Sequence, residues 1–405
     1  MTTVALSTTL SRRIRLFVIL GALSAMGPLS IDFYLPGLPE LSDDLNASAA
    51  QAQLTLTACL AGLAVGQLLA GPLSDRLGRR RPLLIGLAGY TAASLACALS
   101  PTIYALVALR LAQGFAGAGA IVIARAIVRD LRSGAAAARL FSVLMLVTGL
   151  APMLAPILGG QLLQVMSWRG LFVGLGVAGV FLLLGSISWL AETLPPAMRH
   201  GGSWGGTAHT FARLLQDRVF VGYALVLGLA FAQMFAYIAG SPFVLENVYG
   251  VSPQVFAVIF GVNALGIVAL SQLNGLLVGR VGLTRLFEVG LALGTVGGVT
   301  LLTVVLVGGI GLAGILPCLF VIVSSMGLMI PNATALALSG YDPQVAGSAS
   351  ALLGVLQFAL GAVVAPLVGV AGVESAVPMA VVMATLGLSA CAAFLLTRHP
   401  SHAVS

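Results

Sequence analysis

Long apolar runs recur along this 405-residue sequence, and short polar connections separate them. Each run is about twenty residues long, which is the length an α-helix needs to cross the hydrocarbon core of a membrane. Only 8% of the residues are charged, against about 25% in soluble globular domains. The runs lack the strict alternation of membrane β-strands. The sequence therefore predicts an all-α membrane protein.

The runs predict twelve transmembrane helices in two six-helix bundles. The expected spans are 14–37, 51–72, 82–100, 102–127, 140–164, 170–190, 219–245, 255–278, 286–307, 312–337, 348–370 and 376–397. The longest connection, 192–217, is rich in Gly and Pro, so we interpret it as a cytoplasmic linker. It separates an N-terminal bundle at 1–191 from a C-terminal bundle at 218–405, and Phe211–Leu215 is a candidate surface helix within it.

Arginine marks one side of the predicted membrane. Alternate connections carry Arg12, Arg13, Arg15, Arg76, Arg79, Arg80, Arg81, Arg129, Arg132, Arg139, Arg199, Arg213, Arg218, Arg280, Arg285 and Arg398. The opposite connections hold Arg169 as their single basic residue and carry Glu40, Asp43, Asp44, Glu246 and Glu374. Because positive loops stay in the cytoplasm, both termini are expected there. The net charge of +7 thus concerns membrane orientation, and we expect no nucleic-acid partner.

Several functional classes are disfavoured by the residues that are missing. The sequence contains no Lys, which excludes a Walker A loop and a Schiff-base lysine. The four Cys lie within apolar runs without CxxC spacing, and the four His lie in polar segments without ligand spacing. We therefore expect no catalytic residues, no cofactor and no metal site, and hence not an enzyme.

Asp32 is the one acid that lies inside an apolar run. A carboxylate at membrane depth persists only if it is protonated, paired or hydrated. Gly21, Ala25, Pro28 and Asp32 fall on one face of a helix, and the first three are small or helix-bending. Asp32 is therefore expected to point into the protein interior. It is either a proton or cation site, or a buried acid that pins a neighbouring helix.

Arg110 is the second intramembrane charge, about eight residues and on the order of 12 Å inside the fourth span. Gly114, Gly117 and Ala118 share its face, so another helix can approach closely. Arg stays protonated in proteins and must find a carboxylate, a carbonyl or water. Asp32 is the membrane-buried acid available to it. We expect the two to form a proton-coupling pair, and the alternative is a static ion pair that holds the N-terminal bundle together.

The two halves contain related segments. GPLSDRLGRRR at Gly71–Arg81 and GLLVGRVGLTR at Gly275–Arg285 match at an offset of 204 residues. An Ala-Pro-x-x-Gly motif occurs at Ala155–Gly159 and again at Ala365–Gly369. Together the matches indicate an internal duplication, and two parallel six-helix repeats around a central cavity are a known transporter layout. The proline- and glycine-rich fifth and eleventh spans are candidates for a rocking interface between the bundles.

The first of these segments is a candidate conformational latch. Its residues are Gly71, Asp75, Arg76, Gly78 and Arg79, together with Arg125 in the fourth span and Arg129 in the connection after it, the arginines that Asp75 could engage. Asp75 is expected to engage a helix N-terminus or a neighbouring arginine. Gly279 replaces Asp75 in the second copy, so the latch would be asymmetric. The alternative is that these charges only set the topology.

Polar and aromatic residues inside the spans, together with Met145, are candidates for the lining of a substrate cavity. They are Tyr34, Gln113, Met145, Gln233, Tyr237, Asn263, Asn332 and Gln357. Each lines the cavity or instead binds a neighbouring helix. The candidates of the C-terminal half include no acid, which favours a weakly polar pocket for amphipathic molecules, with the ionic chemistry in the N-terminal bundle.

These segments together resemble the major facilitator superfamily over essentially the whole chain. Gly71–Arg81 is similar to its loop 2–3 signature, and Arg110-x-x-Gln113-Gly114 to its fourth-helix signature. Ala151–Gly160 is similar to the fifth-helix signature of its antiporters, with Ala155 where Gly is usual. Segments that resemble the bicyclomycin and chloramphenicol resistance (Bcr/CflA) subfamily are Ser30–Pro39, Ala124–Asp130, Ser167–Phe172, Glu192–Pro195, Phe235–Val244, Pro331–Leu338 and Ala346–Phe358.

This resemblance implies a proton-coupled drug efflux protein of the bacterial cytoplasmic (inner) membrane. Its partners would be protons, the lipid bilayer and small drugs such as chloramphenicol or bicyclomycin, with Asp32 and Arg110 carrying the coupling. We expect a monomer. A proton-coupled metabolite exporter or importer on the same fold is the alternative.

Overall fold

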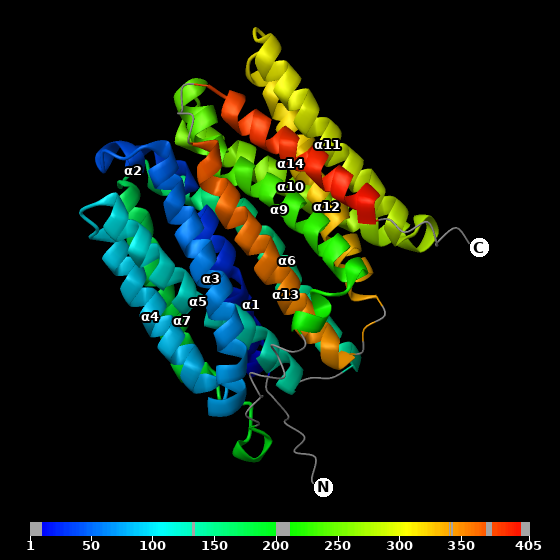
Figure 1. The fold of residues 1–405 in the computed structure, drawn as a ribbon. Helices are drawn as coiled ribbons and strands as arrows, with labels where there is room; N and C mark the ends of the chain where they lie inside the picture. The colour runs from blue at the N-terminus through cyan, green and yellow to red at the C-terminus, as the bar shows by residue number, and fades with distance from the viewer. Residues whose placement is uncertain are drawn as a thin grey trace.

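The computed structural model in Figure 1 describes residues 10–131, 134–199, 211–339, 341, 343–369 and 375–397. Its long helices are α1 (Leu10–Asp32), α3 (Ala49–Leu77), α4 (Arg80–Ala98), α5 (Ile103–Leu131), α6 (Gly134–Leu162), α7 (Trp168–Trp189), α9 (Arg218–Pro242), α10 (Pro253–Val281), α11 (Leu283–Val307), α12 (Leu312–Leu338), α13 (Pro343–Val364) and α14 (Val377–Thr397). Shorter elements are η1 (Leu35–Gly37), α2 (Leu38–Asp44), η2 (Pro196–Met198), η3 (Phe243–Val248) and η4 (Ala365–Val368).

Each of the twelve predicted spans overlaps one of the long helices, which confirms the all-α fold. Nine helices among the described residues are long and apolar enough to cross a membrane by themselves. Within the linker, η2 and residues 211–214 are helical. The four His, Glu374 and Arg398 lie outside the described residues.

The first span differs from its predicted bounds, because α1 ends at Asp32 and not at residue 37. Pro36 and Pro39 follow, and helices usually end before a proline. The chain turns there into η1 and then α2. Asp32 consequently lies at a helix C-terminus and not within a continuous helix.

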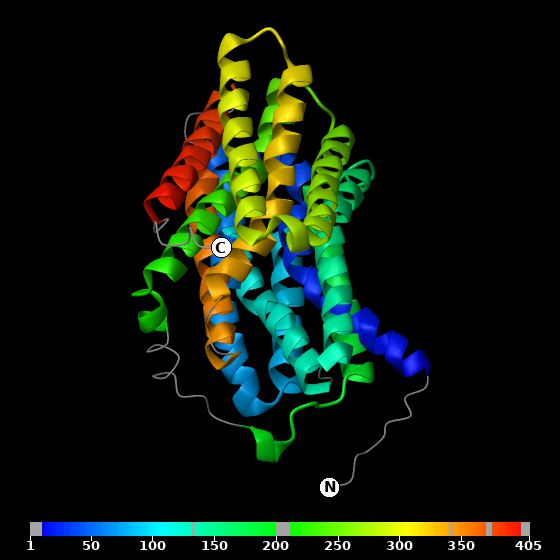
Figure 2. The ribbon, with the colours of Figure 1, turned by 90° about the vertical axis from the view of Figure 1, so that its right-hand side faces the viewer.

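The long helices form two bundles, coloured blue to teal and green to red in Figure 1. In the first, α3 and α4 pack on α5, α7 packs on α4, and α1 packs on α5 and α6. In the second, α11 packs on α12 and α14, and α9 packs on α13 and α14. Figure 2 shows α11 and α12 side by side.

The internal repeat has a matching backbone in the two halves. Ser48 and Ser252 cap the N-termini of α3 and α10, and their side chains accept hydrogen bonds from the third backbone N–H of each helix. Gly78 and Gly282 end these helices, both with φ 89°. Caps and ends are separated by the same 204 residues as the segments Gly71–Arg81 and Gly275–Arg285.

The bundles contact each other near the end that carries α2 and η3. There Gln53 donates to the carbonyl of Ala239 at 2.9 Å, and Thr57 donates to the carbonyl of Ala362 at 2.8 Å. A Cβ on Gly160 of α6 would meet the Pro253 carbonyl oxygen of α10 at 3.1 Å. We call this the closed end.

The bundles separate toward the other end, which we call the arginine-rich end because it carries the α3–α4 connection. Gly149 lies eleven residues before Gly160 on α6, on the same helical face. Among the described side chains, a Cβ on Gly149 would meet nothing within 4 Å, and the same holds for Gly354 on α13. The structure is therefore open between the bundles at the arginine-rich end.

Candidate functional site

Asp32 lies close to the C-terminal bundle, since η1, which begins three residues after it, contacts α9 and α10. The residue is 4% exposed, which confirms that it faces the protein interior. Tyr237 belongs to α9, one of the two helices of the C-terminal bundle that contact η1. The ion pairs formed among the described residues do not include Asp32. Protonation is then the least costly way to remove its charge.

Arg110 is fully buried and binds neutral groups. Its guanidinium donates to the backbone carbonyl of Ser30 at 2.8 Å, to the carbonyl of Thr55 at 3.4 Å and to the side-chain oxygen of Gln113. Its Cζ atom lies 4.5 Å from the centre of the Tyr34 ring. Arg110 therefore connects α1 and α3 to α5.

The expected pairing of Arg110 with Asp32 is absent between these two described residues, and the end of α1 explains why. The last carbonyls of a helix have no partner within the helix, and its C-terminus attracts positive charge. Ser30 supplies one of these carbonyls. Arg110 thus binds the last turn of α1 at Ser30, two residues before Asp32. The carboxyl group of Asp32 takes no part in this contact.

Further hydrogen bonds fix this arrangement within the N-terminal bundle. Gln113 donates to Ser94 at 2.7 Å, and the hydroxyl groups of Ser30 and Tyr90 share a hydrogen bond of 2.8 Å. The hydroxyl of Tyr34 lies 2.8 Å from that of Thr55. Tyr34 and Gln113, both predicted to line a cavity, are fully buried here and support Arg110.

Tyr237 and Asn263 form the polar face of the C-terminal bundle nearest to Asp32. Asn263 on α10 donates to the Tyr237 hydroxyl at 2.8 Å. The Tyr237 ring stacks on Phe260 with a centroid distance of 5.3 Å. Tyr237 is 1% exposed and Asn263 is 3% exposed, so their hydrogen bond joins α9 to α10 within the C-terminal bundle.

Gln233 and Asn332 bind helices within the C-terminal bundle. Gln233 donates to the carbonyls of Gly294 at 3.1 Å and Met383 at 2.7 Å, which joins α9 to α11 and α14. Asn332 donates to Asn274 at 2.5 Å and to the carbonyl of Leu328 at 2.8 Å. Their contacts fit the helix-binding alternative. Gln357 is half-buried on α13, and the side chain of Met145 lies outside the described residues.

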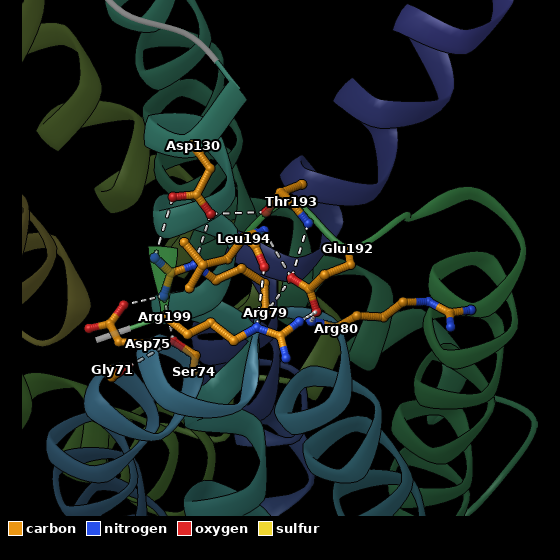
Figure 3. Close-up of polar contacts among 10 residues, drawn as sticks. All are labelled: Gly71, Ser74, Asp75, Arg79, Arg80, Asp130, Glu192, Thr193, Leu194 and Arg199. Carbon is orange, nitrogen blue, oxygen red and sulfur yellow. Dashed lines mark hydrogen bonds and ion pairs between the residues drawn. The ribbon is translucent and has the colours of Figure 1, made fainter. Parts of the chain in front are cut away.

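Arg79 is the centre of a charged cluster at the arginine-rich end (Figure 3). Its guanidinium donates to Asp130 on α5 at 2.8 Å, to Ser74 at 2.8 Å and to Asp75. Burial lowers the pKa of Arg79, but its bonds to Asp130 and Asp75 outweigh burial and raise it above its ordinary value. Asp75 engages an arginine, and that arginine is Arg79, whereas the sequence suggested Arg125 or Arg129.

Glu192 ties the start of the linker to the same cluster (Figure 3). Its carboxylate accepts the backbone N–H groups of Arg79 at 2.8 Å, Arg80 at 3.2 Å, and Thr193 and Leu194 at 3.0 Å each. Since α4 begins at Arg80, the carboxylate also occupies a helix N-terminus. Burial raises the pKa of Glu192, but the backbone hydrogen bonds outweigh this and hold it below its ordinary value.

Gly78 allows this close approach. Its φ of 89° is a conformation that residues with a side chain rarely adopt. A Cβ there would also meet the Glu192 carboxylate and the Arg199 guanidinium, the latter at 2.9 Å.

The charged cluster joins residues of the N-terminal bundle and the linker. Gly71 accepts a hydrogen bond from Ser74 at 2.8 Å, whereas Arg76 and Arg125 are exposed. The side chain of Arg129 lies outside the described residues. Sequence reasoning missed Glu192 and Asp130 as members, although both occur in the segments that carry the family resemblance. Clusters of three or more His, Cys, Asp or Glu able to hold a metal do not occur among the described residues.

Comparison of the sequence with known proteins finds long matches. The Major Facilitator Superfamily matches residues 18–366. An uncharacterized MFS-type transporter of Bacillus subtilis, YdgK, is 43% identical over 389 residues, which cover 95% of this chain and 96% of the relative. A bicyclomycin resistance protein homolog of Haemophilus influenzae is 31% identical over 382 residues, covering 93% and 95%. The multidrug resistance protein MdtL of Escherichia coli is 32% identical over 243 residues, covering 60% and 61%.

Solved structures share the fold at low sequence identity. A bacterial homolog of the human lysosomal transporter Spinster, in an inward-facing and unoccupied conformation, superposes with a TM-score of 0.76 at 14% identity, over 97% of this chain and all of that one. A D-xylose–proton symporter superposes with a TM-score of 0.75 at 16% identity, over 94% and 97%.

Proposed function

This chain belongs to the major facilitator superfamily, and we propose that it exports small amphipathic drugs in exchange for protons. It is a multi-pass membrane transporter and not an enzyme. The relatives named for bicyclomycin resistance and multidrug resistance support drug efflux as its class of transport. Chloramphenicol and bicyclomycin are the substrates we propose first.

One observation carries the proton coupling: a buried acid without an ion-pair partner lies between the bundles. Asp32 is 4% exposed next to η1, which contacts α9 and α10, while Arg110 is bound to carbonyl groups. A carboxyl group in these surroundings takes up a proton when it is enclosed and releases it when water reaches it. Opening and closing of the bundles therefore changes its proton affinity.

We assign Arg110 a positioning role. It fixes the last turn of α1 through the Ser30 carbonyl, so the location of Asp32 depends on it without direct contact. Tyr237 and Asn263 are the residues we propose for drug contact, because they form the polar face opposite Asp32.

The transport cycle follows from the two ends of the interface. By the distribution of arginine, the arginine-rich end faces the cytoplasm, and we propose an inner-membrane location with both termini in the cytoplasm. A drug enters through the open end and displaces the proton of Asp32 inward. The bundles rock, the drug leaves through the opposite end, and a proton binds Asp32 from outside. Each inward charge yields about 2.3 kcal/mol per 100 mV of potential.

The cluster around Arg79 is proposed to act as the latch of the N-terminal bundle. In the open arrangement it binds the bundle's own α5 and the linker. Closure of the arginine-rich end would bring the N-terminus of α13 toward the cluster. The side chain of Asp75, which is half-exposed, would then be available to bind that N-terminus. We propose a monomer as the transporting unit, since each bundle pair encloses one path.

Uptake of labelled chloramphenicol into everted membrane vesicles tests the proposal. Everted vesicles present the cytoplasmic face outward, so an exporter accumulates drug in their lumen when respiration acidifies it. We expect accumulation that an uncoupler abolishes. Uptake that is unaffected by the uncoupler would contradict proton coupling, and accumulation only in right-side-out vesicles would indicate an importer.

A further inference from the structure

A groove runs between α1 and α7 on the outer surface of the N-terminal bundle, remote from the interface between the bundles. Its volume is about 400 Å³, within the range of ligand sites. It is lined by Val18, Ile19, Ala22, Phe181, Leu182, Leu184, Gly185, Ser188 and Trp189. On α7 it extends over eight residues, or about 12 Å.

The floor of the groove is apolar. Ile19 is 3% exposed, and a Cβ on Gly185 would meet its Cδ1 atom at 3.1 Å, so the two helices come close there. The walls are exposed, with Phe181 at 71% and Leu184 at 55%. Ser188 is the one hydroxyl in the lining, and it donates to the carbonyl of Leu184 at 2.8 Å. The groove thus suits a hydrocarbon chain.

The mouth of the groove is positively charged. The Arg15 guanidinium carbon lies 5.4 Å from the centre of the Trp189 ring, one helical turn before Val18. Trp and Arg at the end of a span are typical of the headgroup level of a membrane. The acid of α1, Asp32, is at the closed end, and α7 contains no acid. The nearest acid along the chain, Glu192, is occupied by backbone N–H groups.

We propose that this groove binds an anionic phospholipid, with one acyl chain between α1 and α7 and the phosphate on Arg15. The apolar floor excludes the headgroup, and the exposed arginine at the mouth complements its charge. The occupant is a lipid of the cytoplasmic leaflet, because the groove faces the bilayer and ends at the arginine-rich end. A single interfacial arginine is worth roughly fivefold in affinity for an anionic over a zwitterionic lipid.

Native mass spectrometry of the purified full-length protein tests the proposal, with dioleoyl phosphatidylglycerol and dioleoyl phosphatidylcholine as probes. Ala22→Trp fills the groove, and Val296→Trp, on the exposed face of α11, is its matched control. Arg15→Gln removes the charge at the mouth, and Arg285→Gln is the control at the same end of the C-terminal bundle. Thermal unfolding of each variant confirms that it is folded.

We expect the wild type to retain one phosphatidylglycerol more than Ala22→Trp, and both controls to behave as the wild type. Arg15→Gln should lose the roughly fivefold preference for phosphatidylglycerol over phosphatidylcholine. Equal retention by wild type and Ala22→Trp would overturn the site. If Ala22→Trp does not fold, the test rests on Arg15→Gln, and an unchanged lipid preference in that variant would by itself overturn the proposed site.

Discussion

Glu192 and Gly78 form one unit at the scale of single residues. The carboxylate accepts four backbone N–H groups because the chain beside it turns through a glycine with φ 89°. The repeat supplies a natural comparison, since Gly282 has the same φ and a Cβ there would meet nothing within 4 Å.

Gly78→Ala should therefore destabilise the protein more than Gly282→Ala. Both variants force alanine into a conformation that costs on the order of 1–3 kcal/mol. Only Gly78→Ala also displaces the Glu192 carboxylate. Thermal unfolding in detergent measures the difference in stability between the two variants. An equal loss of stability in both would show that the contact between Gly78 and Glu192 contributes nothing to it.

The stability that Glu192 provides should depend on pH. Its folded-state pKa is lowered, so its contribution is present above the ordinary glutamate pKa of 4.5 and is lost as the pH falls through the lower folded value. Glu192→Gln should lower stability by about 0.5–1 kcal/mol near neutral pH, because the side chain is partly exposed.

The matched measurement is the unfolding temperature of wild type and Glu192→Gln from neutral pH to well below the ordinary glutamate pKa of 4.5. The two curves should converge on acidification. A constant gap at all pH values would mean that the charge of Glu192 is not the source of the stability.

At the scale of helices, α3 and α5 pack through small residues. A Cβ on Gly62 would meet the Leu111 carbonyl oxygen and lie 2.7 Å from the Phe115 nitrogen. Gly114, predicted to allow such contact, faces the backbone of Cys59. This contact sets the position of Arg110, because the Thr55 carbonyl that it binds belongs to α3.

Gly62→Ala and Gly275→Ala should change stability in opposite directions. Both lie inside 29-residue helices, and alanine favours a helix over glycine by about 1 kcal/mol. Gly275 has open space around it, so Gly275→Ala should be neutral or stabilising. Gly62→Ala should cost about 1–3 kcal/mol from overpacking. Chemical unfolding in detergent checks the sign, and a stabilised Gly62→Ala would contradict the packing described.

Sequence patterns predicted the helices and the burial of Asp32 because both follow from the membrane itself. An apolar run of sufficient length must be a helix, and a carboxylate within it must avoid lipid. The partner of Arg110 could not be predicted from the sequence patterns, because it depends on where α1 ends. The free Ser30 carbonyl exists because the prolines after Asp32 end the helix early. Glu192 was missed because a carboxylate in a polar linker has no pattern that distinguishes it from a solvated charge.

At the scale of the whole molecule, the bundles touch at one end and separate at the other. Gly160 contacts α10, whereas Gly149, on the same face of α6, has open space. In a chain whose four cysteines are replaced, Gly149→Cys should react with a membrane-impermeant maleimide in everted vesicles, and Gly160→Cys should not. Labelling of Gly160→Cys alone would indicate the opposite orientation or a bundle pair that is open at the other end.

The central claim is that Asp32 carries the proton that a drug displaces. The measurement that tests it is proton release from everted vesicles on addition of chloramphenicol, in wild type, Asp32→Asn and Asp43→Asn. Asp43 is an exposed acid at the closed end, so its variant makes the same chemical change outside the interface. We predict release from wild type and Asp43→Asn, and no release from Asp32→Asn although it still binds the drug. Undiminished release from Asp32→Asn would contradict the account and assign the proton to another group.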